Sequence, residues 1–172
     1  MKTYIVLCEL FYVTEIKASI QINSTVDKVW NVVSDLDRES KFWNNITKTR
    51  TLSRENNVIK YEITIGKVDR CLQTVMFYPQ EKIIAEFTKG MIGGTKTTML
   101  TPRDGGTFLE IIWDVKFKGM AGFMSGKINS DFQNNTEQAV LAIKHASEGS
   151  ISQSSFTMET RTHWADKFDS NK

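Results

Sequence analysis

Cysteine and histidine are both scarce in this chain of 172 residues. The two cysteines, Cys8 and Cys71, show no CxxC or Cys/His spacing. Two cysteines are too few for a disulfide framework, so we expect reduced thiols in a cytoplasmic protein. The histidines, His145 and His163, fall near the end of the last predicted helix and in the tail, away from other metal-binding residue types. The sequence therefore predicts no metal site and no cofactor.

Charge of one sign and long hydrophobic runs are also missing. Lys and Arg total 22 against 20 Asp and Glu, and the charges are scattered along the chain. A nucleic-acid binder needs a concentrated basic surface, so we expect no nucleic-acid partner. The first apolar run, in "MKTYIVLCELFYV", is interrupted by Glu9 and is shorter than the roughly 20 residues of a membrane span. No small-residue cleavage site follows it, so residues 1–13 are predicted to extend the first strand.

Sequence motifs of known catalytic sites are also missing. The sequence has no GxSxG, HExxH, Walker or Rossmann pattern, and "GMIGGTK" lacks the first glycine of a phosphate-binding loop. We therefore assign no catalytic residue from motifs.

The periodicity of apolar residues predicts the elements that are present. Ile16, Ala18, Ile20 and Ile22 alternate with polar residues, which is typical of a strand with one buried face. Ser24, with an acidic residue three positions later, resembles a capping box before an amphipathic helix at about 25–34. A second short helix is expected to end near 44.

Strand signals then dominate as far as residue 117. Turn-forming segments such as "RENN", "YPQE" and "PRDGG" separate the runs, and such short links join antiparallel neighbours. After Gly119 the period becomes helical, and this long helix is expected to end at Gly149. The strands are predicted near 46–53, 57–65, 67–78, 82–89, 95–101 and 107–117.

Two segments carry a family resemblance. "IQINSTVDKVWNVVSDLDRESKFW" and "GGTFLEIIWDVKF" resemble the opening and the last hairpin of the START-related (SRPBCC) superfamily. That superfamily includes polyketide cyclase/dehydrase and lipid transport proteins, coenzyme Q-binding proteins and Bet v I-type pollen allergens. The chain departs from its usual pattern at Thr25, where proline is common, and at Phe42 and Trp43.

The resemblance implies an α+β helix-grip fold. Its strongly curved, seven-stranded antiparallel sheet has two short helices after the first strand, and a long C-terminal helix lies over the sheet and encloses a cavity. The ligand-binding domain would span residues 14–148, followed by a Ser-rich tail at 149–172 whose role the sequence leaves open. Independently of the resemblance, Gly119, Gly122 and Gly126 are expected to loosen the first turns of the long helix, which makes this apolar start a candidate for transient membrane or protein contact.

The cavity predicted by this fold defines the candidate site. A possible polar part comprises Arg70, Asp131 and Asn135, whose facing the sequence does not determine. The predicted ligand-binding residues are Tyr61, Ile63, Phe87 and Trp113 from the strands, and Phe123, Met124, Ile128 and Phe132 from the long helix. These residues would also fill a core without any ligand.

The superfamily serves several functions, so three hypotheses follow. The first is binding or carriage of a hydrophobic small molecule, such as a lipid, an isoprenoid quinone or a polyketide-like compound, without catalysis. The second is a polyketide cyclase or dehydratase that uses polar residues of the pocket. The third is a protein-interaction or assembly factor with a collapsed pocket. The sequence predicts neither the ligand nor the oligomeric state.

Overall fold

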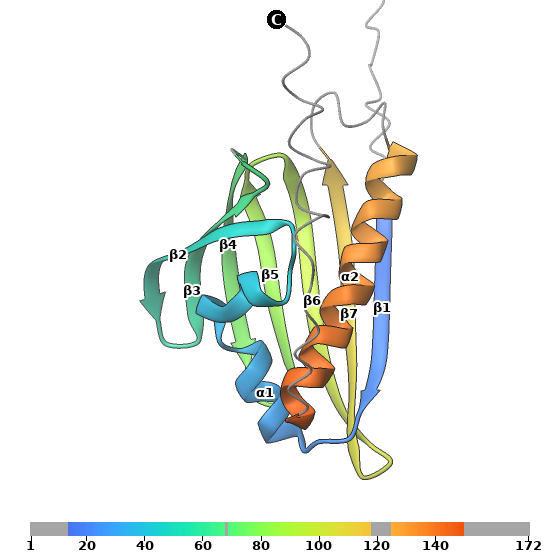
Figure 1. The fold of residues 1–172 in the computed structure, drawn as a ribbon. Helices are drawn as coiled ribbons and strands as arrows, with labels where there is room; N and C mark the ends of the chain where they lie inside the picture. The colour runs from blue at the N-terminus through green and yellow to red at the C-terminus, as the bar shows by residue number, and fades with distance from the viewer. Residues whose placement is uncertain (1–13, 68, 118–124, 150–172) are drawn as a thin grey trace, which may run out of the picture.

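Seven antiparallel strands form a curved sheet in the computed structural model, which describes residues 14–67, 69–117 and 125–149 (Figure 1). The sheet order is β1-β7-β6-β5-β4-β3-β2, so the first and last strands of the chain are neighbours. The strands are β1 (Thr14–Ile22), β2 (Ile46–Glu55), β3 (Val58–Ile65), β4 (Asp69–Tyr78), β5 (Lys82–Lys89), β6 (Ile92–Arg103) and β7 (Gly106–Phe117).

Helical segments cover one face of this sheet. The short helix α1 (Val26–Val33) and the 3-10 helix η1 (Leu36–Lys41) follow β1, and the long helix α2 (Ser125–Glu148) follows β7. Helix α2 packs mainly along β1, with further contacts to β7 and α1 (Figure 1). This arrangement confirms the predicted α+β helix-grip fold. No helix in the described ranges is long and apolar enough to cross a membrane.

Strand β7 shows how the sequence pattern builds the core. Leu109, Ile111, Trp113 and Val115 are all buried, as the alternation predicts, while the residues between them are partly or fully exposed. β7 pairs with β1 on one side and with β6 on the other, so it is the second strand of the sheet and lies beside the strand on which α2 mainly packs.

The capping box predicted at Ser24 is wrong. Helix α1 has Thr25 as its N-cap, without a capping hydrogen bond from the side chain. The Ser24 hydroxyl donates instead to the backbone oxygen of Ser147, at 3.0 Å, near the end of α2. A tertiary partner has replaced the local one, because the end of α2 lies beside the β1–α1 connection.

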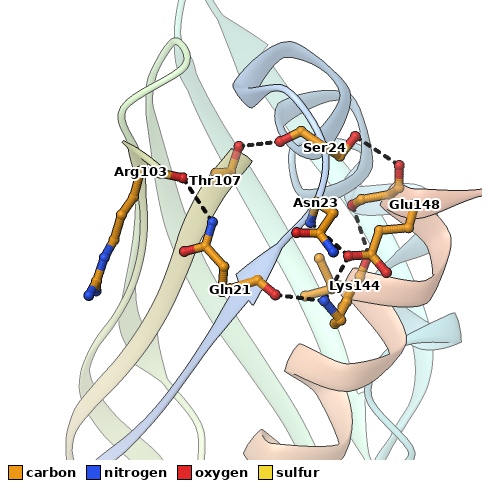
Figure 2. A network of polar contacts seen from close by, with 9 residues as sticks. Gln21, Asn23, Ser24, Arg103, Thr107, Lys144 and Glu148 are labelled. Carbon is orange, nitrogen blue, oxygen red and sulfur yellow. Dashed lines mark hydrogen bonds and ion pairs between the residues drawn. The ribbon is translucent and has the colours of Figure 1, made fainter. Parts of the chain in front are cut away.

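A polar network fastens this end of α2 (Figure 2). Lys144 Nζ donates to the backbone oxygen of Gln21 and pairs with Glu148 Oε1, both at 2.7 Å. Glu148 Oε1 also accepts from the backbone N–H of Asn23 at 2.7 Å. The contacts among Lys144, Gln21, Glu148 and Asn23 therefore tie the C-terminal end of α2 to the end of β1.

Several element boundaries differ from the prediction by two residues or more. The second short helix is the 3-10 helix η1, which ends at Lys41 instead of near residue 44. Strand β6 begins at Ile92, three residues earlier than predicted, because Gly93 and Gly94 continue the pairing with β7. Gly94 has φ +112°, and a Cβ there would lie 2.2 Å from the backbone oxygen of Asp114, so only glycine fits this close approach.

Candidate ligand-binding site

An aromatic cluster occupies the space between the sheet and α2. Trp113 of β7 stacks on Phe87 of β5, with ring centroids 5.7 Å apart. Trp43 and Phe132 each pack against the same indole in a T-shaped arrangement, with ring centroids 5.2 and 5.4 Å away. Trp43 comes from the segment after η1 and Phe132 from α2, so three layers of the fold meet at this indole. Such a cluster presents a broad apolar surface to anything inserted between sheet and helix.

A charged pair lies directly beside these rings. The Nζ atom of Lys96, on β6, forms an ion pair and hydrogen bond with Glu39 Oε1 of η1, and both side chains are only 8% exposed. The same Nζ atom lies 4.9 Å from the ring centroid of Trp43 and 5.3 Å from that of Trp113. Charges this deeply buried are rare unless they are paired, and the two indole faces add favourable contacts for the ammonium group.

A small cavity lies against this pair. Its volume is about 40 Å³, which is room for a few waters. Its walls come from α1, η1 and the following turn, β4 to β7, and α2. The lining residues are Val32, Val33, Asp35, Leu36, Glu39, Phe42, Trp43, Gln73, Val75, Ile83, Ala85, Lys96, Thr98, Ile111 and Ile143.

Two buried polar atoms on residues that line the cavity lack partners. Glu39 Oε2 and Gln73 Nε2 have no hydrogen-bond partner among the described residues, although Gln73 is only 2% exposed. Trp113 Nε1, in the neighbouring aromatic cluster, is also buried without a hydrogen-bond partner among the described residues. Buried polar groups nearly always find partners, and an orphaned one costs roughly 1–3 kcal/mol. These atoms are therefore candidates for contact with water or with a polar group of a ligand.

Tyr61 secures the segment that carries Glu39. Its phenol, fully buried on β3, donates to the backbone oxygen of Leu36 at the start of η1. Burial raises the pKa of Tyr61 well above its ordinary value of 10.0, and the nearby Glu39 carboxylate raises it further. The phenol therefore stays protonated and acts as a hydrogen-bond donor that positions η1.

Comparison with known families identifies the chain's relatives. The family profile described as "Polyketide cyclase / dehydrase and lipid transport" matches residues 13–168. The chain belongs to this family. The match runs beyond residue 148, into the segment that the sequence analysis set apart as a tail. None of the curated proteins matches the chain significantly.

Solved structures support the fold of this polyketide cyclase/dehydrase and lipid transport family member. A Thermus thermophilus protein has a TM-score of 0.70 at 15% identity, covering 81% of this chain and 100% of its own. The Zhui aromatase/cyclase from a Streptomyces species has a TM-score of 0.59 at 12% identity, with 80% and 93% covered. A START superfamily protein from Mycobacterium smegmatis has 0.57 at 18%, with 78% and 94% covered. At these identities the likeness concerns the fold alone.

The structure brings several of the predicted residues together in this family member. Trp113, Phe87 and Phe132 form the aromatic cluster, and the first two are buried while Phe132 is partly buried. Tyr61 and Ile63 are also fully buried on β3. Whether any of the five contacts a ligand stays a prediction.

The remaining predicted residues are placed differently. Phe123 and Met124 lie outside the described residues, and so does the side chain of Ile128. The residues of the possible polar part are not in one place. Arg70 is exposed on β4, whereas Asp131 Oδ2 is buried on α2 without a partner among the described residues. Asn135 Nδ2 donates to the backbone oxygen of Asp131 at 2.8 Å, within α2. None of these three lines the cavity at the charged pair.

Sequence reasoning missed the residues that line this cavity with polar atoms. Lys96 and Thr98 share the phase of buried Leu100 on β6, and Gln73 stands between buried Cys71 and Val75 on β4. This alternation could have identified them, because a lysine at every second position from buried apolar residues of a strand is predicted to face the same side as those residues. No comparable pattern marks the carboxylate partner, Glu39, which is in the acidic segment "SDLDRES". Its burial depends on η1 folding against the sheet.

In the described part of the chain, no three His, Cys, Asp or Glu residues gather closely enough to hold a metal ion.

Proposed function

We propose that this protein binds a hydrophobic small molecule between the sheet and α2, with the ligand's polar end at Glu39 and Lys96. A lipid, an isoprenoid quinone or a polyketide-like compound has the required combination of a large apolar body and a polar end. The family's description, which includes lipid transport, supports this class of ligand. In this proposal the protein carries the ligand and performs no chemistry on it.

One observation carries the proposal: Glu39 and Gln73 line the same small cavity, and each has a buried side-chain atom without a hydrogen-bond partner among the described residues. Replacing a buried ion pair by apolar residues of similar volume is often neutral or stabilising, by about 1–4 kcal/mol. Folding alone therefore does not account for Glu39 and Lys96 at this place. A bound polar group would satisfy the orphaned atoms and explain why the pair is present.

The cavity is smaller than the ligand that we propose. Pockets for small molecules usually measure about 300–1,000 Å³, so the ligand's apolar body needs more room than the described residues leave. Phe132 is the aromatic side chain that α2 contributes to the cluster. Helix α2 is tied to β1 beside it, where Gln133 donates to the backbone oxygen of Lys17, and again near its C-terminal end. We infer that entry turns the Phe132 side chain away from Trp113 while α2 stays in place.

Native mass spectrometry with organic extraction of the purified protein tests the proposal directly. We expect a bound lipid, quinone or polyketide-like compound, or a mass shift when such compounds are added. The variant Ala85→Leu should reduce uptake at least tenfold, because Ala85 lines the cavity and the larger side chain fills it. The same change at exposed Ala146 of α2 is the control and should leave uptake unchanged.

The opposite result has a definite meaning. If the protein is recovered without ligand and its mass does not shift with any compound of the panel, the carrier proposal is refuted. The interaction factor with a collapsed pocket then becomes the better hypothesis, because the described interior is nearly filled.

A second candidate function is favoured by the titratable side chains at the cavity. Glu39 could accept a proton from an acidic C–H of a polyketone, while Lys96 stabilises the negative charge that develops on the carbonyl oxygen. Incubation with an unreduced polyketone would then yield a cyclised or dehydrated product. Under this hypothesis Lys96→Met abolishes turnover, whereas under the carrier hypothesis the compound is recovered unchanged from the wild-type protein.

A further inference from the structure

Two residues that line the cavity have a buried side-chain atom without a partner among the described residues, one a donor and one an acceptor. Glu39 Oε2 can only accept a hydrogen bond while the carboxylate is ionised, and Gln73 Nε2 can only donate one. Both side chains line the same cavity of about 40 Å³, and both residues are more than nine-tenths buried. A group that satisfies both atoms must therefore donate to one and accept from the other.

We propose that the cavity recognises a neutral hydroxyl group, phenolic, enolic or alcoholic, on the hydrophobic ligand. The hydroxyl donates to Glu39 Oε2, and its oxygen accepts from Gln73 Nε2. This inference rests on the proposed binding function and adds to it the polar group that the ligand must present.

The charges around the cavity exclude the ionised alternatives. Glu39 and Lys96 neutralise each other, and the other charged side chain in the lining is Asp35. A ligand carboxylate would be buried near two carboxylates with one cation between the three. A ligand ammonium group would have to compete with Lys96 for Glu39, at the cost of losing its own hydration.

Hydrogen-bonding capacity excludes neutral groups that only accept, and the small size of the cavity favours a group with a single heavy atom. A ketone or ether oxygen accepts from Gln73 but leaves Glu39 Oε2 without a donor. A hydroxyl group provides both functions in one heavy atom, which suits a cavity with room for only a few water-sized groups. Thr98, which also lines the cavity, can add a further hydroxyl contact.

Isothermal titration calorimetry with a matched set of probes tests this inference at neutral pH. The set is naphthalene, methoxynaphthalene, naphthol and naphthoate, which share one ring system and differ in the polar group. We expect naphthol to bind about 10- to 100-fold more tightly than naphthalene or methoxynaphthalene, as one charge-assisted hydrogen bond allows. Naphthoate should bind more weakly than naphthol.

The variant Gln73→Met separates the hydroxyl contact from the apolar contacts. It keeps the side-chain length and removes the amide, so the advantage of naphthol over naphthalene should fall about fivefold or more while naphthalene affinity is retained. Gln138→Met makes the same change at an exposed position of α2 and should alter neither affinity.

The possible outcomes distinguish the two proposals. Equal affinities for naphthol and naphthalene, or tighter binding of naphthoate, would overturn the hydroxyl inference and leave the binding function intact. The inference also fails if Gln73→Met retains the full preference for naphthol. If none of the four compounds binds, both the hydroxyl inference and the proposed binding of a hydrophobic molecule are contradicted.

Discussion

Removing one partner of the buried ion pair should destabilise the protein strongly. The change Lys96→Met leaves the Glu39 carboxylate buried without its cation, and we expect a loss of about 3–5 kcal/mol in the free energy of unfolding. Glu39→Gln leaves the ammonium group of Lys96 between Trp43 and Trp113, which still attract it. The loss there should be smaller, about 2–4 kcal/mol, because each cation–π contact contributes about 0.5–2 kcal/mol.

Removing both partners should restore most of this loss. Two unit charges about 3 Å apart attract by about 5 kcal/mol at an effective dielectric constant of about 20. Burying each ion costs several kcal/mol, so attraction and desolvation nearly cancel. The double variant Lys96→Met/Glu39→Met should therefore have a free energy of unfolding within about 2 kcal/mol of the wild type, or higher than it.

Urea unfolding followed by circular dichroism measures these differences. With a slope of about 2 kcal/mol per molar urea, a loss of 3–4 kcal/mol lowers the midpoint by about 1.5–2 M. The pair between Lys17, whose side chain is 49% exposed, and Glu110, with a separation of 2.7 Å, is the control. Lys17→Met should cost less than about 1 kcal/mol, because solvent screens that pair.

Two results would refute this reasoning. Single variants at Lys96 and Glu39 that both lie within about 0.5 kcal/mol of the wild type would show that solvent reaches the pair. A double variant that loses the sum of the two single losses would show that the residues act independently. A folded double variant that no longer binds ligand would show that the pair is retained for binding.

Three further perturbations test the fold and the site. Gly94→Ala should lower the free energy of unfolding by about 2–4 kcal/mol, because its Cβ would collide with β7. Gly105→Ala is the control and should cost about 1 kcal/mol, because nothing lies within 4 Å of its Cβ. Equal losses in urea or thermal unfolding would contradict the collision. The free energy of unfolding should fall as the pH rises above 10.0, because Tyr61 loses its proton in the unfolded chain while its raised pKa keeps the folded phenol protonated. Tyr61→Phe should make the decrease of stability with pH shallower in this range. An unchanged decrease would contradict the raised pKa of Tyr61. Phe132→Ala should lower the free energy of unfolding by about 2–3 kcal/mol, because it empties part of the aromatic cluster. The space that it opens should increase naphthalene uptake in calorimetry. Lower uptake would contradict the entry route past Phe132.

The fold was largely predictable because its elements have strong periodicities. The alternation along residues 107–117 specified both strand β7 and its buried face, and the change from period two to period 3.6 near residue 24 placed α1. Local signals failed where a tertiary contact replaced them. Ser24 has the chemistry of an N-cap, yet it bonds to the end of α2, which is more than a hundred residues away in the chain.

The candidate site was only partly predictable. Aromatic residues such as Trp113 and Phe87 follow the apolar phase of their strands, so their place in the core could be derived. Lys96 follows the same phase, but a lysine in a strand usually faces solvent, and its partner comes from another element. Glu39 is in a polar, acidic stretch, and its burial arises only when Tyr61 and Lys96 hold η1 against the sheet.

Carrier and enzyme would use the same contacts at this cavity. A hydroxyl that donates to Glu39 Oε2 is held for recognition, but the same oxygen is placed to accept a proton if the substrate presents an acidic C–H there. Catalysis further requires a second reacting atom held about 3–3.5 Å away. The two functions therefore differ in what happens to the bound compound, and the double variant at Lys96 and Glu39 offers a direct comparison. Because it should stay folded without the charges, loss of affinity alone would indicate a carrier, whereas loss of product with retained affinity would indicate an enzyme.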